Sequence, residues 1–245
     1  MTPRIFVGAD VRALAPGTDY ALPAPAAHHV AQVLRMRAGH ALTLFTGAGG
    51  EYEATIARVE RRAVVLHIER HVPVERESPC PVTLVQSLIA ADMMDWVVRK
   101  AVELGVAAIA PVHAARSQRV PPERAARRVD HWRQIAVAAC EQCGRNRLPD
   151  ILPLVPFDEW IEAHGAPDRF AILDAGAGRS LASLFAAEPP LAVAIGPEGG
   201  FTAEELRHAG ERGALPAHLG RRVLRAETAA VAALATATAI AGDAR

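Results

Sequence analysis

The chain has 245 residues, enough for one large domain or two smaller ones, and 51% of them are hydrophobic while 22% are charged. This is the composition of a globular protein, and it excludes wholesale disorder. The 27 basic residues balance the 27 acidic ones, so no overall positive field marks the protein as a nucleic-acid binder.

Signals for export and for membrane insertion are missing from the sequence. The opening residues, MTPRIFVGAD, show no basic segment followed by an apolar one, and the most apolar tract, residues 228–242, is too short to span a bilayer. Three cysteines in a chain of this length argue against a disulfide framework. We therefore expect a cytoplasmic protein without membrane contacts.

The first 70 residues predict strands joined by tight turns. Short strand-like segments occur at 41–45, 51–59 and 63–69, and one helical turn is expected at 28–36. The segment VPVERESPCP (72–81) then combines three prolines with charged residues, which is typical of a linker. This part of the chain predicts a small β-rich domain.

From Val82 onward, apolar strands alternate with helical patterns, which predicts an α/β domain with a mostly parallel sheet covered by helices on both faces. The expected strands are 82–88, 106–112, 150–155, 169–173, 191–195 and 216–220. The expected helices are 92–104, 121–140, 157–164, 180–185, 202–212 and 227–242.

Ligands of such sheets bind beside the carboxyl ends of the strands, and two loops there carry unusual residues. GPEGG (196–200) follows the strand 191–195 and precedes a helix with the capping box Thr202–Glu205. Its glycines permit close approach to the backbone amides. LGRRVLRAETAAVAAL (219–234) places arginines before the start of a helix. That arrangement suits an anion, although a capped terminal helix with a solvated basic turn has the same pattern.

Two other motifs are interpreted as structural. LDAGAGRS (173–180) follows a strand and contains glycines, as a Rossmann-type loop does. However, three strand–helix pairs precede it, and Ser180 stands where a third glycine is expected. We interpret it as a turn. Cys140 and Cys143 form a single CxxC pair without further ligands at metal spacing, so no metal is expected.

Five sequence blocks occur along the chain in this order: HHVAQVLRMRAGH (28–40), MDWVVRKAVELGVAAIAPVHAARSQ (94–118), ACEQCGRNRLP (139–149), IGPEGGFTAEEL (195–206) and LGRRVLRAETAAVAAL (219–234). Taken together, the five blocks and their order are a specific signal. They resemble the bacterial RsmE family, the 16S ribosomal RNA (uracil-1498-N3)-methyltransferases. The resemblance spans nearly the whole chain.

The resemblance implies a PUA-like RNA-binding β-barrel over residues 1–74 and an α/β SPOUT domain with a trefoil knot over residues 75–245. It also implies a homodimer that uses S-adenosyl-L-methionine (SAM) to methylate N3 of a uridine in the 16S rRNA of the small ribosomal subunit. Carried over to this sequence, the cofactor wall consists of Gly196, Pro197, Glu198, Gly199, Gly200, Leu219, Gly220, Leu224 and Ala226.

The reaction that the resemblance implies requires uracil N3 to be aligned with the methyl group and to lose a weakly acidic proton. Arg225 is the first candidate to stabilise the uracil anion, while Glu227, Glu198 and the block around Glu141 remain alternatives for holding the proton. Phosphate contacts are expected in the basic stretch 113–147 and in the N-terminal domain, at Arg35, Arg37, Arg116, Arg119, Arg145, Asn146 and Arg147.

Two positions depart from the family pattern. The stretch IAADM (89–93) has no lysine where family members carry lysines, which removes one expected RNA contact, and Ala226 stands where threonine is usual. Other hypotheses are a SPOUT enzyme for another RNA position, a Rossmann-type methyltransferase that uses LDAGAGRS, and a non-catalytic RNA-binding protein. The identity of the general base and the choice between naked RNA and assembled subunit stay open.

Overall fold

The computed structural model describes residues 2–8, 14–60, 63–164, 170–187, 189 and 191–241. The chain forms two compact units: unit 1 contains residues 1–77 and 140–148, and unit 2 contains residues 78–139 and 149–245. Residues 169 and 242, which bound two of the expected elements, lie outside the described residues.

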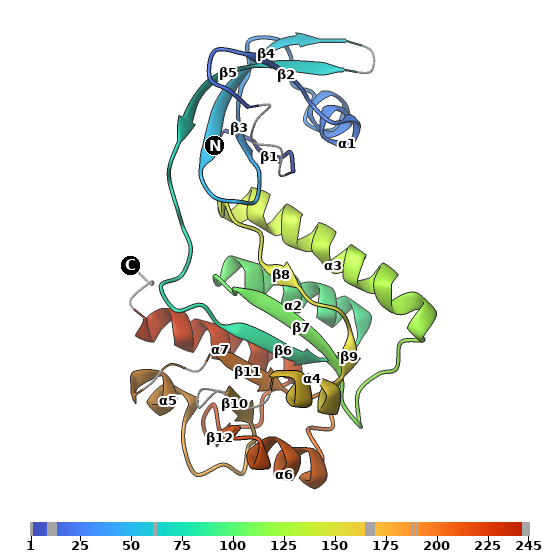
Figure 1. The fold of residues 1–245 in the computed structure, drawn as a ribbon, viewed down its shortest axis with the longest axis vertical. Coiled ribbons are helices and arrows are strands. Elements are labelled where there is room, and N and C mark those ends of the chain that lie inside the picture. Colours follow the sequence, from blue (N-terminus) through green and yellow to red (C-terminus); the bar gives the residue numbers. More distant parts are fainter. Residues whose placement is uncertain are drawn as a thin grey trace. The chain divides into compact units, whose positions relative to one another are not determined.

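Unit 1 is built on one mixed sheet with the strand order β1-β3-β4-β5-β2 (Figure 1), in which β1 and β3 are parallel and the other neighbours are antiparallel. Alternate residues in the first part of β4 are buried, as expected for a strand with one face on a core. The elements are β1 (Arg4–Phe6), β2 (Asp19–Ala21), α1 (Ala24–His28), the π-helical η2 (His29–Val33), β3 (Ala41–Phe45), β4 (Glu51–Val59) and β5 (Val64–Val72). The predicted β-rich N-terminal unit is confirmed.

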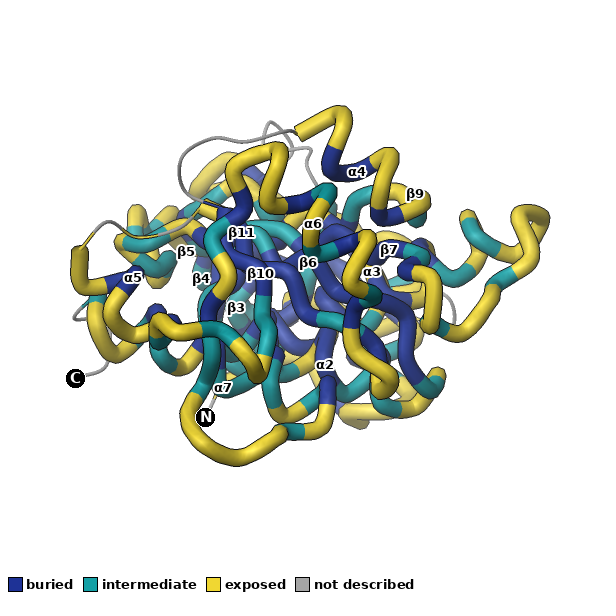
Figure 2. The backbone as a smooth tube through the Cα atoms, turned by 90° about the horizontal axis from the view of Figure 1, so that it is seen from below, coloured by how far each residue is buried: buried dark blue, intermediate teal, exposed yellow. Residues whose placement is uncertain are grey.

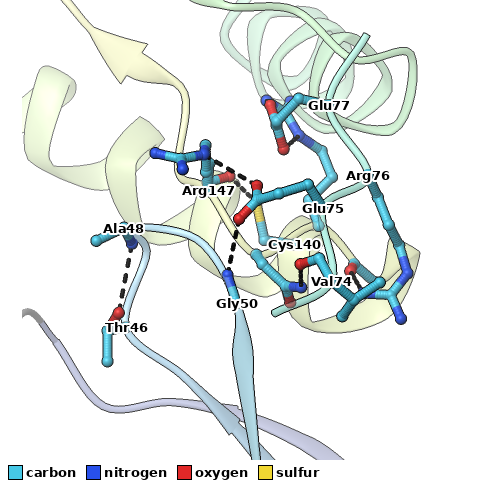
Figure 3. A network of polar contacts seen from close by, with 12 residues as sticks. Thr46, Ala48, Gly50, Val74, Glu75, Arg76, Glu77, Cys140 and Arg147 are labelled. Atoms are coloured by element: carbon cyan, nitrogen blue, oxygen red, sulfur yellow. Dashed lines mark hydrogen bonds and ion pairs between the residues drawn. The ribbon is translucent and has the colours of Figure 1, made fainter. Parts of the chain in front are cut away.

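The segment 73–77 is bound into unit 1 rather than free, which corrects its interpretation as a linker. Figure 3 shows Glu75 between two partners, with one carboxylate oxygen accepting from the Gly50 backbone N–H at 2.9 Å and the other from Arg147 Nε at 2.9 Å. Prolines and charges are typical of linkers, but they fit equally well in an irregular segment that is held by side-chain hydrogen bonds.

Unit 2 contains a seven-stranded sheet in the described residues, with the order β12-β10-β11-β6-β7-β8 and with β9 also beside β7. All of its neighbours are parallel, which confirms the predicted α/β fold. The strands are β6 (Thr83–Ser87), β7 (Ala108–His113), β8 (Asp150–Ile151), β9 (Val155–Pro156), β10 (Phe170–Leu173), β11 (Ala192–Ile195) and β12 (Leu215–Ala217). The helices are α2 (Ala91–Glu103), α3 (Pro122–Cys143), α4 (Phe157–His164), α5 (Leu181–Ala187), α6 (Ala203–Glu211) and α7 (Ala226–Ile240); the last turn of α3 belongs to unit 1.

Helices cover both faces of this sheet. Helices α4 and α6 share a core with Ala192 and Ala194 of β11. Val193 and Ile195, which alternate with these two alanines, are also buried and face the opposite side of the sheet. On that side, α7 packs against α2 and α5. Figure 2 shows β6, β7 and β11 as buried segments, whereas α4 and α6 carry exposed outer turns.

His208 of α6 links this helix to α4. Its Nδ1 lies 3.2 Å from Asp158 Oδ1 and its Nε2 lies 2.9 Å from Glu162 Oε1, and Arg212 contacts the same Glu162 carboxylate. The hydrogen bonds with Glu162 and then Asp158 raise the pKa of His208 above its usual value of 6.5. Its contribution to stability is therefore fully present below that unfolded-state pKa and is lost as pH rises through the folded-state pKa.

We expect His208→Gln to lower the thermal unfolding midpoint at acidic pH and to have a smaller effect at alkaline pH. Thermal scans of both proteins from about pH 5.5 to about pH 8.5 measure this difference. A difference between the two proteins that does not change with pH would contradict the assignment.

Candidate functional site

Loops from the carboxyl ends of four adjacent strands of unit 2 enclose one cavity of about 700 Å³. The strands are β12, β10, β11 and β6, and the site lies where ligands of parallel sheets bind. The residues of the lining that come from the two glycine-containing loops are Gly196, Pro197, Glu198, Gly199, Gly200, Leu219, Gly220, Arg222, Val223, Leu224 and Arg225. All nine residues predicted to form the cofactor wall line this cavity.

The loop after β11 has its shape because specific glycines occupy specific positions. A Cβ atom at Gly196 would lie 3.0 Å from the Phe201 backbone nitrogen, so no larger residue fits without a shift. Gly200 has φ +67°, a left-handed conformation that favours glycine. Its N–H donates to the Pro197 carbonyl oxygen at 2.8 Å, which closes a tight turn. At its three glycines the loop therefore presents backbone to the cavity, between the side chains of Pro197 and Glu198.

Helix α6 begins directly after this loop, with the predicted capping box. The Thr202 side chain accepts from the Glu205 N–H, and the Glu205 carboxylate accepts from the Thr202 N–H at 2.7 Å. Such reciprocal capping satisfies two helix-end donors. The end of the loop is consequently anchored.

The loop after β12 brings cationic and anionic groups to the same cavity. Gly220 has φ +116°, and Arg225 is the N-cap residue of α7, with no side-chain capping bond. Arg225 and Glu227 both line the cavity, as does Glu198 from the opposite loop. Arg225 is exposed, and no ion pair involves it among the described residues. Its guanidinium is therefore available to a ligand.

Sequence reasoning missed several lining residues, notably Asp174, Ala175, Ala90, Met93 and His218. Asp174 and Ala175 belong to LDAGAGRS, the motif interpreted as a turn, and they follow β10. The feature that these two residues share with the other lining residues is their position after a strand end. The glycine spacing of the motif does not identify the lining, since Gly176 and Gly178 themselves do not line the cavity.

The residues predicted to contact RNA fall into two classes. Arg35, Arg37, Arg116, Arg119 and Arg147 are exposed. Arg35 has φ +54°, an unusual conformation for a residue other than glycine.

Arg145 and Asn146 are buried, 4% and 0% exposed. Arg145 pairs with Glu77 through two nitrogens, and Asn146 Nδ2 donates to the Val74 carbonyl oxygen at 2.8 Å. Their polar atoms are thus used within unit 1, and this burial argues against the phosphate contacts predicted for them.

The CxxC pair is also part of the structure of unit 1. Burial raises the pKa of the Cys140 thiol to about 12, and its sulfur lies 3.7 Å from the Arg147 carbonyl oxygen as a donor. A thiol with such a pKa stays protonated and unreactive at neutral pH. Within the described ranges no group of three or more His, Cys, Asp or Glu side chains is arranged to hold a metal ion.

No helix in the part of the chain that the structure describes is both long and apolar enough to cross a membrane. This includes α7, which contains most of the apolar tract 228–242.

Comparison with known proteins places the chain in a family. Residues 76–238 match the RNA methyltransferase domain, and residues 22–69 match the RNA methyltransferase PUA domain. Ribosomal RNA small subunit methyltransferase E of Buchnera aphidicola is 28% identical over 244 residues, which are 98% of this chain and 94% of that protein.

Two solved structures match this chain over 98% of its length and over 98% of the length of their own chains. A Legionella pneumophila structure, described as a methyltransferase in complex with the bound cofactor SAM, is 38% identical with a TM-score of 0.91. Ribosomal RNA small subunit methyltransferase E from Neisseria gonorrhoeae, bound to S-adenosyl methionine, is 33% identical with a TM-score of 0.89. The chain belongs to the ribosomal RNA small subunit methyltransferase E family.

Proposed function

We propose that the protein transfers a methyl group from SAM to N3 of a single uridine, position 1498, in 16S rRNA of the small ribosomal subunit. One observation carries this proposal: the two loops that the family resemblance assigns to the cofactor meet around one cavity, at the strand ends of a chain whose relatives are named ribosomal RNA small subunit methyltransferase E.

The cavity fits SAM in size and in chemistry. Its volume of about 700 Å³ lies within the usual range for small-molecule sites. Ile195, Leu219 and Leu224 supply apolar surface for the adenine, and the loop 196–200 supplies backbone hydrogen-bonding groups. The carboxylate of Asp174, which also lines the cavity, suits the ribose hydroxyls or the ammonium group.

SAM supplies, when bound, a methyl group on a sulfonium that leaves as a neutral thioether. The side chains of this protein must then orient the uracil and move one proton. Arg225 stabilises the negative charge that develops on the uracil oxygens as N3 loses its proton. Glu227 or Glu198 accepts that proton, and the nitrogen lone pair forms the new N–C bond. Both carboxylates line the same cavity as Arg225.

Three of the exposed arginines, Arg35, Arg37 and Arg119, are proposed to bind RNA phosphates. Arg35 and Arg37 do so from unit 1, while Arg119 does so from unit 2, where it follows β7. Arg147 is expected to contribute less to phosphate binding, because its guanidinium already pairs with Glu75.

We expect the affinity for a 16S RNA fragment to fall as salt increases, and Arg119→Ala to reduce the slope of log K against log salt by about 0.7, the value for one contact with a single strand. Filter binding over a range of salt concentrations measures the slope. An unchanged slope for Arg119→Ala would remove this contact from the proposal.

The finer architecture is proposed on the family resemblance. Unit 1 is a PUA-like RNA-binding barrel, and unit 2 is a SPOUT domain whose cofactor loops belong to a trefoil knot. The protein acts in the cytoplasm as a homodimer. Sedimentation equilibrium of the purified protein tests the dimer directly.

The function is tested by incubating the protein with radiolabelled SAM and small ribosomal subunits from a strain that lacks the modification, followed by mapping of the methylated nucleotide. Label at N3 of one uridine near the 3′ end of 16S RNA supports the proposal. SAM binding without label would keep the cofactor assignment and remove the substrate.

A further inference from the structure

The two adjacent glycines of the cofactor loop are required for different physical reasons. Gly200 has a left-handed φ of +67°, whereas Gly199 has no such conformation. The backbone at position 199 would therefore accept a side chain. What restricts this position is space, since a Cβ atom there would lie 3.2 Å from Cδ and 3.4 Å from Cβ of Arg116.

Arg116 occupies the space that the missing side chain leaves and also binds the loop. Its Nη1 donates to the Gly199 carbonyl oxygen at 2.8 Å. The aliphatic stem thus lies against the Gly199 Cα, while the guanidinium holds the carbonyl of the same residue. This side chain was expected to contact RNA, but in unit 2 it packs on the wall of the cofactor cavity.

Arg116 can act as a support because its own segment is fixed. The Ala115 N–H donates to Glu205 Oε1 at 2.7 Å, and Glu205 is a buried carboxylate, 6% exposed, that also caps α6. Two residues further on, the Gln118 N–H donates to the Leu88 carbonyl oxygen at 3.3 Å. The segment after β7 is therefore tied both to the start of α6 and to the segment after β6.

The loop 196–200 has few other side-chain contacts that could set its position. Glu198 Oε1 accepts from the Ala90 N–H at a long 3.4 Å, and the turn from Pro197 to Gly200 fixes only local geometry. The bond from Arg116 to Gly199 connects the tip of the loop to a rigid neighbour.

We propose that Arg116 is a positioning residue for SAM binding that holds the loop 196–200 in its binding-competent shape. Glycine is required at position 199 because a side chain there would occupy the space of the Arg116 side chain. The inference rests on the proposed function, in which SAM occupies the cavity. Binding to a loop that is only fractionally in the competent shape is weakened by that fraction, so losing Arg116 weakens SAM binding without touching the reacting atoms.

The test is a double-mutant cycle with Arg116→Ala, Gly199→Ala and the combined variant, measured by calorimetry of SAM binding to the full-length protein. We expect each single variant to weaken SAM binding about tenfold, which is the lower range for a lost hydrogen bond to a charged group. The double variant should be no weaker than the weaker-binding single variant, because both changes remove the same contact. Arg116→Lys, which retains a cation and a flexible stem, should recover part of the affinity.

Kinetic and RNA-binding measurements separate this role from general damage and from a phosphate contact. The KM for SAM should rise in Arg116→Ala, while kcat at saturating SAM and the affinity for RNA stay within about twofold of the parent. Arg127→Ala, which removes an exposed arginine of α3 with no assigned role, is the matched control and should bind SAM like the parent.

Two outcomes overturn the inference: unchanged SAM affinity in Arg116→Ala, whether or not RNA binding weakens, or fully additive effects in the cycle. Failure of the parental protein itself to bind SAM would instead refute the proposed function. The parent and the variants therefore report on the two hypotheses separately.

Discussion

Arg225→Ala is expected to lower the rate constant of methyl transfer about 100- to 1000-fold, the usual loss when a group that stabilises developing negative charge is removed. Arg225 lines the cavity and has no capping bond or described ion pair to hold it elsewhere. Its removal should therefore leave the fold intact. Single-turnover kinetics with saturating SAM and unmethylated small subunits measure the effect on the chemical step.

A neighbouring arginine supplies the control. Arg221 is exposed and lies in the same loop, but it does not line the cavity, so Arg221→Ala should react within about threefold of the parent. Arg225→Lys keeps the charge without the planar fork and should fall between alanine and the parent. Methylation by Arg225→Ala at the parental rate would exclude Arg225 from catalysis and leave the carboxylates Glu198 and Glu227 as the groups to test.

The parallel sheet was predictable because its strands are buried on both faces. A strand such as β11, in which all residues are buried, appears in the sequence as an unbroken apolar run that ends at a glycine. The loop 196–200 could be located for the same reason, since it follows such a run. The loop 219–225 follows the short, partly exposed β12, and its glycine and arginines were what marked it. Glycine is needed at Gly200 and Gly220 by local backbone conformation, and local requirements are visible in a sequence.

The contribution of Asp174 to the cavity could not be predicted in this way. It depends on β10 lying between β11 and β12, and strand order is set by non-local pairing rather than by any residue in the loop. The short strands β1 and β2, each of three residues, were missed because they carry too few residues for alternation to be recognised.

Arg145 shows the same limit for charged residues. In the sequence it is one of eight arginines in a basic stretch, and nothing local distinguishes it from the exposed Arg147. The structure pairs it with Glu77, 68 positions away in the chain. Burial and ion pairing of this kind arise only from the fold, so a basic stretch predicts neither which arginine is free nor which is structural.

Arg145→Ala is expected to lower the free energy of unfolding of unit 1 by about 3 kcal/mol, which is the lower end of the range for breaking a buried ion pair. The Arg145 side chain is 5% exposed and that of Glu77 is 27% exposed. The two nitrogens on one carboxylate form a bidentate pair, so removal of the arginine leaves a half-buried carboxylate without a partner. Hydrogen exchange of the β3, β4 and β5 amides, followed through denaturant, reports on unit 1 alone.

Arg147→Ala is the matched control, because its pair with Glu75 is exposed on both sides, 52% and 43%. Pairs of this kind contribute about 1 kcal/mol or less, so the two substitutions, at arginines two positions apart, should differ by about 2 kcal/mol in their effect on stability. Their effects on RNA binding should follow the opposite order, since only Arg147 presents its guanidinium to solvent. The contrary outcome is that the two variants lose the same stability and that Arg145→Ala binds RNA more weakly. Arg145 would then separate from Glu77 and bind phosphate, as expected from the sequence.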